Sequence, residues 1–110
     1  MTNYIKFYLD SEIIFKDILT ENYLSPQALK LLMLCYIHFP KELDFISVSG
    51  LKKLDLFTKT FNYPRTLQEL YRAELLTAYP QSKKILYRLS NKGKLLMQKF
   101  AYSIMEIDDF

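Results

Sequence analysis

The stretch that decides the fold is Tyr63-Pro-Arg-Thr-Leu-Gln-Glu-Leu-Tyr-Arg-Ala-Glu-Leu-Leu, residues 63–76 of the chain. Proline is tolerated at the first position of a helix, so Pro64 predicts a helix from Pro64 to Glu74. Three residues form its expected apolar face: Leu67, Leu70 and Tyr71. Four polar residues follow i, i+3, i+4, i+7 spacing and share the opposite face: Arg65, Gln68, Glu69 and Arg72. The stretch therefore predicts an amphipathic helix that buries one side and presents a polar side to solvent.

Two short apolar runs after this helix predict a β-hairpin. Leu75–Tyr79 and Ile85–Leu89 are the expected strands, and the polar Pro80–Lys84 is the expected turn, which gives the hairpin a basic tip. Ser90 or Asn91 is expected to cap a last helix. Five apolar residues lie on that helix: Leu95, Leu96, Phe100, Ile104 and Ile107. An acidic tail follows, with Glu106, Asp108 and Asp109.

The residues just before Tyr63 predict a short strand, a short helix and a turn. Phe45–Ser47 is the expected strand, and Ser47 or Ser49 is expected to cap the helix. The apolar residues of this helix are Leu51, Leu54 and Leu56. Thr58–Asn62 is the expected turn between this helix and the next one.

Two longer helices are expected in the first 40 residues. Ser25, a good N-cap, and Pro26 predict the start of a central buried helix over Gln27–Phe39, which Pro40 ends. An earlier helix is expected from about Asn3 to Leu19, with a short strand over Tyr4–Leu9 as the alternative. Its apolar residues cover more than one face. A second apolar face needs a surface to bury it, which predicts a partner subunit.

The charge of the chain is divided unevenly. The segment from Lys52 to Lys94 holds ten basic residues and three acidic ones, a net charge of +7. The remainder holds five lysines and nine acidic residues, a net charge of −4. This asymmetry predicts an anionic partner for the second half of the chain.

Composition argues against several classes of protein. The chain has one cysteine, Cys35, and one histidine, His38, so neither an internal disulfide nor a metal site is expected. Cys35 lies in an apolar run and is expected to be a buried thiol. No catalytic constellation and no glycine-rich phosphate loop is present, so we expect neither an enzyme nor a cofactor. The chain has no signal-peptide pattern and no apolar run long enough to span a bilayer, which predicts a cytoplasmic protein.

In order and spacing, these elements resemble the MarR-like winged-helix regulators, and in length the small SarA-like ones. The resemblance covers about Ser25 to Phe100. Residues 46–56 are similar to the first helix of their helix-turn-helix, and residues 63–76 are similar to their recognition helix and first wing strand. Leu86-Tyr-Arg-Leu-Ser-Asn-Lys-Gly-Lys-Leu-Leu resembles their second wing strand and the start of the next helix. The hairpin departs from the pattern because it is short and lacks an Asp-x-Arg motif, and Glu74 stands where the family has a small residue.

The resemblance implies a mainly α fold with a small antiparallel β wing, a winged helix-turn-helix. The expected organisation is a single domain over residues 1–110. Residues 1–24 would be an N-terminal dimerisation helix, 25–90 the winged helix-turn-helix core, and 91–110 the C-terminal helix and acidic tail. The expected partner is double-stranded DNA, bound by a homodimer that regulates transcription. The alternatives are a winged-helix protein-interaction adaptor without DNA binding, and a replication or mobile-element accessory factor.

A helix in the major groove contacts base edges with its exposed face, which assigns roles to the candidate residues. Arg65 is expected to contact guanine and Gln68 adenine, whereas Arg72 is expected to reach phosphate. Glu69 would accept from cytosine or pair with Arg65 or Arg72. Four residues around the turn would contact phosphates: Thr58, Lys59, Thr60 and Thr66. Three residues of the hairpin would neutralise the flanking backbone or enter the minor groove: Lys83, Lys84 and Arg88.

Overall fold

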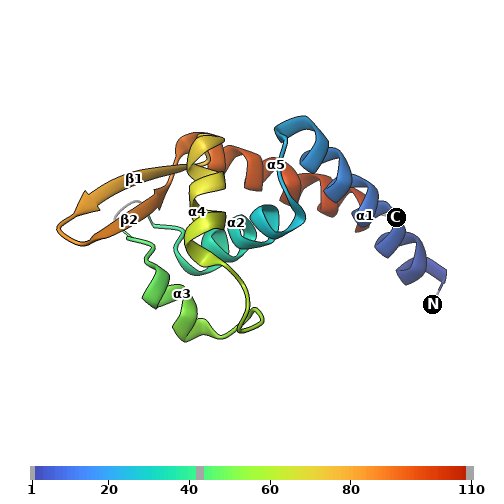
Figure 1. Ribbon diagram of the computed structural model, residues 1–110. Helices are drawn as coiled ribbons and strands as arrows, with labels where there is room; N and C mark the ends of the chain where they lie inside the picture. Colours follow the sequence, from blue (N-terminus) through green and yellow to red (C-terminus); the bar gives the residue numbers. More distant parts are fainter. Residues whose placement is uncertain (1, 42–43, 109–110) are drawn as a thin grey trace.

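Residues 2–41 and 44–108 are described by the computed structural model (Figure 1). The elements in chain order are α1 (Thr2–Asn22), α2 (Pro26–His38), α3 (Val48–Leu54), α4 (Tyr63–Arg72), β1 (Leu76–Gln81), β2 (Lys84–Leu89) and α5 (Asn91–Asp108). The described residues are mainly helical and contain a small antiparallel sheet of two strands. This confirms the mainly α class with a small antiparallel sheet that the sequence predicts.

The first two helices follow the sequence prediction closely. α1 is helical throughout, so the alternative strand over Tyr4–Leu9 is wrong. The Ser25 hydroxyl accepts the N–H of Ala28 at 3.2 Å and caps α2, with Pro26 in the first turn. Six side chains of α2 are buried, including Cys35, and burial raises the pKa of this thiol to about 12. α2 is therefore the central buried helix, and Cys35 is the buried thiol that was expected.

α3 is shorter than the sequence predicts. Of the two serines considered, Ser47 is the cap, because its hydroxyl accepts the N–H of Gly50 at 3.0 Å. The helix ends at Leu54, and Leu56 lies beyond it and is exposed. The expectation of a helix through Leu56 is wrong, because the chain turns at Asp55, whose backbone is left-handed with φ 49°.

α4 begins one residue before the predicted start, because the side-chain oxygen of Asn62 caps the helix ahead of Tyr63. Leu67 and Leu70 are fully buried, as expected, and α4 packs against α2. Tyr71 is 49% exposed, so its assignment to the apolar face is wrong. Successive residues point in different directions around a helix, and the Tyr71 position therefore lies at the edge of the packed face.

The hairpin is longer and its turn tighter than predicted. β1 and β2 pair from Leu76 opposite Leu89 to Gln81 opposite Lys84. Pro80 therefore lies inside β1 and not in a turn over residues 80–84, which corrects that expectation. A proline is tolerated there because, among the described residues, β1 pairs with a strand on one side only. The turn itself is Ser82-Lys83, with Ser82 in the left-handed region at φ 47°.

One pair of residues fastens the hairpin to the segment before α3. Ile46 and Tyr87 exchange two backbone hydrogen bonds, at 2.7 Å and 2.9 Å. The expected strand over Phe45–Ser47 is thus reduced to a single bridge. Pairing stops after Ile46 because Ser47 already serves as the cap of α3.

α5 begins in close contact with the segment between α4 and β1. Ser90 is the cap, because its hydroxyl accepts the N–H of Gly93 at 2.9 Å and donates to the Glu74 carbonyl at 2.7 Å. Gly93 is buried, and a Cβ at this position would collide with the Leu75 carbonyl. Leu95 is exposed although it was expected on the apolar face, and Met97 is buried instead. The side chains of Ile107 and of the acidic tail lie outside the described residues.

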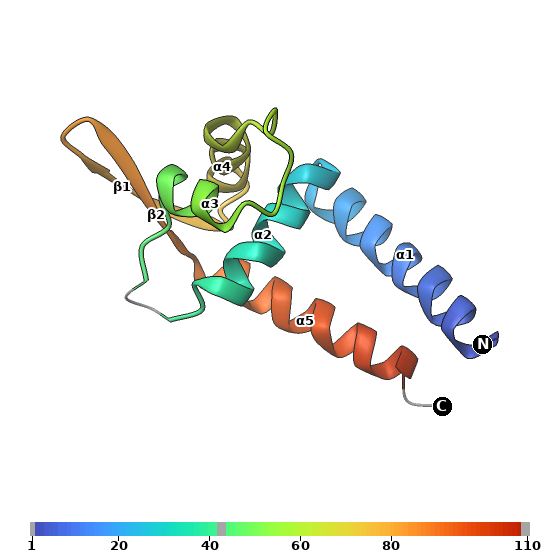
Figure 2. The same ribbon diagram turned by 90° about the horizontal axis from the view of Figure 1, so that it is seen from below.

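The core lies where α2, α4, β1 and the start of α5 meet, and α1 packs along α5. In both views α1 and α5 extend away from the hairpin as two arms (Figures 1 and 2). Over residues 2–41 and 44–108, the structure contains no helix that is both long and apolar enough to cross a membrane.

Candidate nucleic-acid interface

Three side chains on the polar face of α4 are exposed to solvent. Arg65, Gln68 and Arg72 are all exposed and follow one another along the helix. Their direction is set by the opposite face, where Leu67 and Leu70 are fully buried. A rigid helix thus carries two guanidinium groups and one amide, which are donors suited to base edges and phosphates.

Glu69, the fourth residue of this predicted face, has another role. Its carboxylate accepts two hydrogen bonds from Ser25, from the backbone N–H at 2.8 Å and from the hydroxyl at 3.0 Å. The expected pairing with Arg65 or Arg72 is not among the ion pairs of the described residues. Glu69 therefore ties α4 to the start of α2, where a helix N-terminus also favours negative charge.

The turn before α4 brings three of its four candidate residues to the surface. Thr58, Lys59 and Thr60 are exposed, and the two threonine hydroxyls lie 3.2 Å apart. Thr66 is buried, and its hydroxyl donates to the Asn62 carbonyl at 2.8 Å. The expected phosphate contact by Thr66 is therefore wrong, because its side chain is satisfied inside the first turn of α4.

Aromatic rings hold this turn in place. Phe57 and Phe61 stack with ring centroids 4.3 Å apart, and Tyr63 lies against Phe61 at 4.8 Å. Tyr63 is buried and Phe61 is half-buried. The rings give the segment between α3 and α4 a small apolar support of its own, so the exposed hydroxyls and Lys59 are held next to the start of α4.

The hairpin separates its three cations into two environments. Lys83 and Lys84 are exposed at the tip. Arg88 lies further along β2 and is half-buried, with its guanidinium 3.9 Å from the Phe45 ring centroid and 5.0 Å from that of Tyr79. Its Nε is buried and has no hydrogen-bond partner in the described part of the chain. Arg88 therefore braces the hairpin by cation–π contact, whereas the lysines are free to meet an anion.

The same contacts act on the Tyr79 phenol. A hydrogen bond from the Thr77 hydroxyl lowers the pKa of Tyr79, and the charge and hydrogen bonding of Arg88 lower it further. Tyr79 is at the surface, so the shift is a local property of the hairpin and has little consequence for stability.

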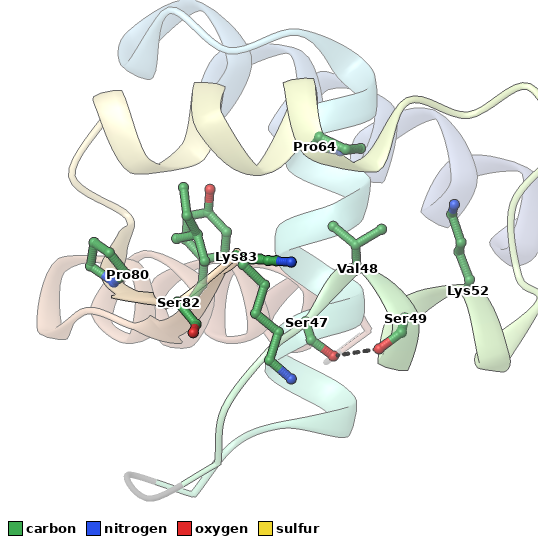
Figure 3. A pocket seen from close by; sticks show the side chains of 11 residues that line it. Ser47, Val48, Ser49, Lys52, Pro64, Pro80, Ser82 and Lys83 are labelled. Carbon is green, nitrogen blue, oxygen red and sulfur yellow. Dashed lines mark hydrogen bonds between the residues drawn. The ribbon is translucent and has the colours of Figure 1, made fainter.

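The structure adds one cation that the sequence analysis did not single out. Lys52 of α3 lines an open hollow of about 730 Å³ together with Lys83 and Lys84 of the hairpin. Figure 3 shows residues of α3 on one side of this hollow, the hairpin on the other, and Pro64 of α4 above. Lys52 lies in the basic segment of the sequence, but only the packing of α3 opposite the hairpin brings the three lysines to the border of one hollow.

The comparisons with known families, curated proteins and solved structures find no match to this chain. Within residues 2–41 and 44–108, no group of three or more metal-ligating side chains comes together. The functional interpretation therefore depends on the geometry of the chain itself.

Proposed function

We propose that this chain is a cytoplasmic winged helix-turn-helix protein that binds double-stranded DNA as a homodimer and regulates transcription. α3, the turn and α4 would form the helix-turn-helix, and the hairpin would be the wing. The observation that carries the proposal is the exposed face of α4, with Arg65, Gln68 and Arg72 in a row. The lysine-lined hollow between α3 and the hairpin begins at the N-terminal end of the same helix.

The chemistry of these side chains fits the grooves and backbone of a duplex. Arg65 lies near the helix start, where a recognition helix contacts base edges, and its planar guanidinium matches guanine. Gln68 is one turn further along and matches adenine. Arg72 is at the end of α4 and would reach phosphate, and the lysines of α3 and the hairpin would neutralise the backbone beside the groove.

The homodimer is supported by an exposed apolar stripe on α1. Five large apolar residues of this helix are exposed: Tyr4, Ile5, Tyr8, Leu9 and Ile13. α5, which packs along α1, also exposes Tyr102 and Met105. An apolar stripe of this kind is costly to leave in water, and a second copy of the same arm would cover it. Two copies of α4 would then read two half-sites of a palindrome.

The test is selection of bound sequences from a random duplex pool at moderate salt. We expect a palindromic consensus from the wild-type chain. Arg65→Ala is expected to reduce discrimination at one base pair in each half-site, by about 1–3 kcal/mol, while leaving nonspecific binding in place. Failure to enrich any sequence, together with no duplex binding at low salt, would refute the proposal.

The exposed stripe on α1 also supports a second candidate function, a protein-interaction adaptor. In that case the stripe would bind a different protein, and the charge of α4 would be a solvated surface. The two functions differ in one measurement. A regulator binds duplex DNA with a steep dependence on salt, whereas an adaptor shows weak attraction at low salt and a stable complex with another protein.

A further inference from the structure

Tyr23 combines an unfavourable backbone with almost complete exposure. It has φ 55°, in the left-handed region, and its side chain is 94% exposed. It follows the last residue of α1, where glycine or asparagine is usual because a Cβ is disfavoured there. The Tyr23 ring is not packed in the core, and it does not lower the strain of its left-handed backbone. Backbone strain clusters at functional sites, and unlike Asp55 and Ser82, which serve a helix end and a hairpin turn, Tyr23 carries a large apolar ring into solvent.

The segment around Tyr23 is fixed relative to α4. Leu24, the next residue, is buried in the core, and its N–H donates to the Leu19 carbonyl at 3.0 Å. Ser25 is held by the two hydrogen bonds to Glu69 of α4. Tyr23 is thus next to the buried Leu24 and two residues from Ser25, which is hydrogen-bonded to α4. The backbone of Tyr23 is therefore fixed relative to α4, although its ring lies in solvent.

Tyr23 shares a hollow with the polar face of α4. Tyr23 and Glu21 line this hollow from the end of α1. Three residues of α4 line it as well: Arg65, Gln68 and Arg72. Glu74, from the segment between α4 and β1, and Lys92 of α5 complete it. In Figure 2 the end of α1, the turn before α4 and α4 itself lie on the same side of the molecule. The proposed base-reading side chains and Tyr23 therefore border one surface.

We propose that Tyr23 is a DNA-contacting residue at the edge of this surface. Its ring packs against a deoxyribose of the flanking backbone, and its hydroxyl donates to a phosphate oxygen. Glu74 in this hollow is paired with Lys92, whose Nζ lies 3.9 Å from its carboxylate, whereas Glu21 borders the side of Tyr23 and repels phosphate there. A neutral phenol makes a contact there that does not depend on a positive charge. This inference rests on the proposed duplex binding and extends its footprint to the α1–α2 connection.

The test compares Tyr23→Gly and Tyr23→Phe with the wild-type full chain on the selected duplex. Glycine removes both the ring and the backbone strain, so we expect the Tm to rise by about 4 °C. The same variant is expected to raise the dissociation constant about tenfold. Phenylalanine keeps the ring and loses the hydroxyl, and we expect the dissociation constant to rise about threefold with an unchanged Tm. A gain in stability together with a loss of binding distinguishes a functional ring from a structural one.

Suppose that the wild type binds the duplex and that Arg65→Ala loses discrimination, so that the proposed function holds. Two results would then overturn the role of Tyr23. One is an unchanged dissociation constant for Tyr23→Gly. The other is a fall in Tm for Tyr23→Gly, because the ring would then support the fold. Absence of duplex binding by the wild type would overturn the proposed function and this inference together, so the two failures are distinguishable.

Discussion

The charge at the hairpin tip gives a quantitative prediction for salt dependence. Five cations border the proposed duplex surface of one protomer: Lys52, Lys59, Arg72, Lys83 and Lys84. A dimer would then neutralise about ten phosphates, and the slope of log K against log salt would be about −9. Doubling the salt concentration from about 100 to about 200 mM would weaken binding about 500-fold.

Lys83→Gln removes two of these cations from the dimer. The slope is expected to fall in magnitude to about −7.2, and doubling the salt would weaken binding about 150-fold. Fluorescence anisotropy on one labelled duplex at several salt concentrations measures both slopes. Lys99→Gln is the matched control, because Lys99 is exposed on α5 and borders none of these hollows. Equal slopes for wild type and Lys83→Gln, or the same change in Lys99→Gln, would refute the assignment of the hairpin tip to the backbone.

Three further predictions concern stability and assembly. Gly93→Ala should lower the free energy of unfolding by about 3 kcal/mol in urea titration, because the new methyl group meets the Leu75 carbonyl, and a change within the error of the titration would contradict this contact. The raised pKa of Cys35 means that the folded thiol stays protonated while the unfolded thiol ionises, so its contribution to stability should be constant below pH 9.0 and should fall as the pH rises from 9.0 towards about 12. Alkylation at pH 8 should accordingly be slow in the native chain and fast in urea. Cys35→Ala is the control: it should remove the fall that begins at pH 9.0 and keep the fall above pH 10.0 that burial of the Tyr87 phenol causes by raising its pKa. Tyr8→Glu places a charge in the exposed stripe of α1 and should convert a dimer into a monomer in sedimentation analysis with unchanged helical circular dichroism, whereas a monomeric wild type would contradict the proposed homodimer.

Local signals in the sequence were sufficient for most of the elements. Ser25, Ser47 and Ser90 are residues that favour helix caps, and each accepts the N–H three residues later. The buried pair Leu67 and Leu70 also follows from helical spacing alone. Capping and periodicity depend on neighbours within one turn, so they can be recognised without knowledge of the rest of the fold.

The element ends were harder to predict wherever a longer-range partner decides them. Pro80 is a turn-forming residue by local preference, but pairing with β2 keeps it inside β1. The strand expected at Phe45–Ser47 shrinks to one bridge because Ser47 begins α3. In the first case a tertiary contact overrides a local preference, and in the second the local cap of α3 competes with the pairing of Ile46 and Tyr87.

Local signals in the sequence likewise predict one part of the candidate site, and long-range contacts decide the other. The sequence alone determined the amphipathic face of α4 and the basic hairpin, because charge and spacing are properties of one segment. Only the tertiary structure decided that Glu69 is hydrogen-bonded to Ser25, that Arg88 is stacked on Phe45, and that Lys52 lies across from the hairpin lysines. Each of these contacts joins segments that are far apart in the sequence. Their distance in space depends on how α2, α3, α4 and the hairpin pack around the core.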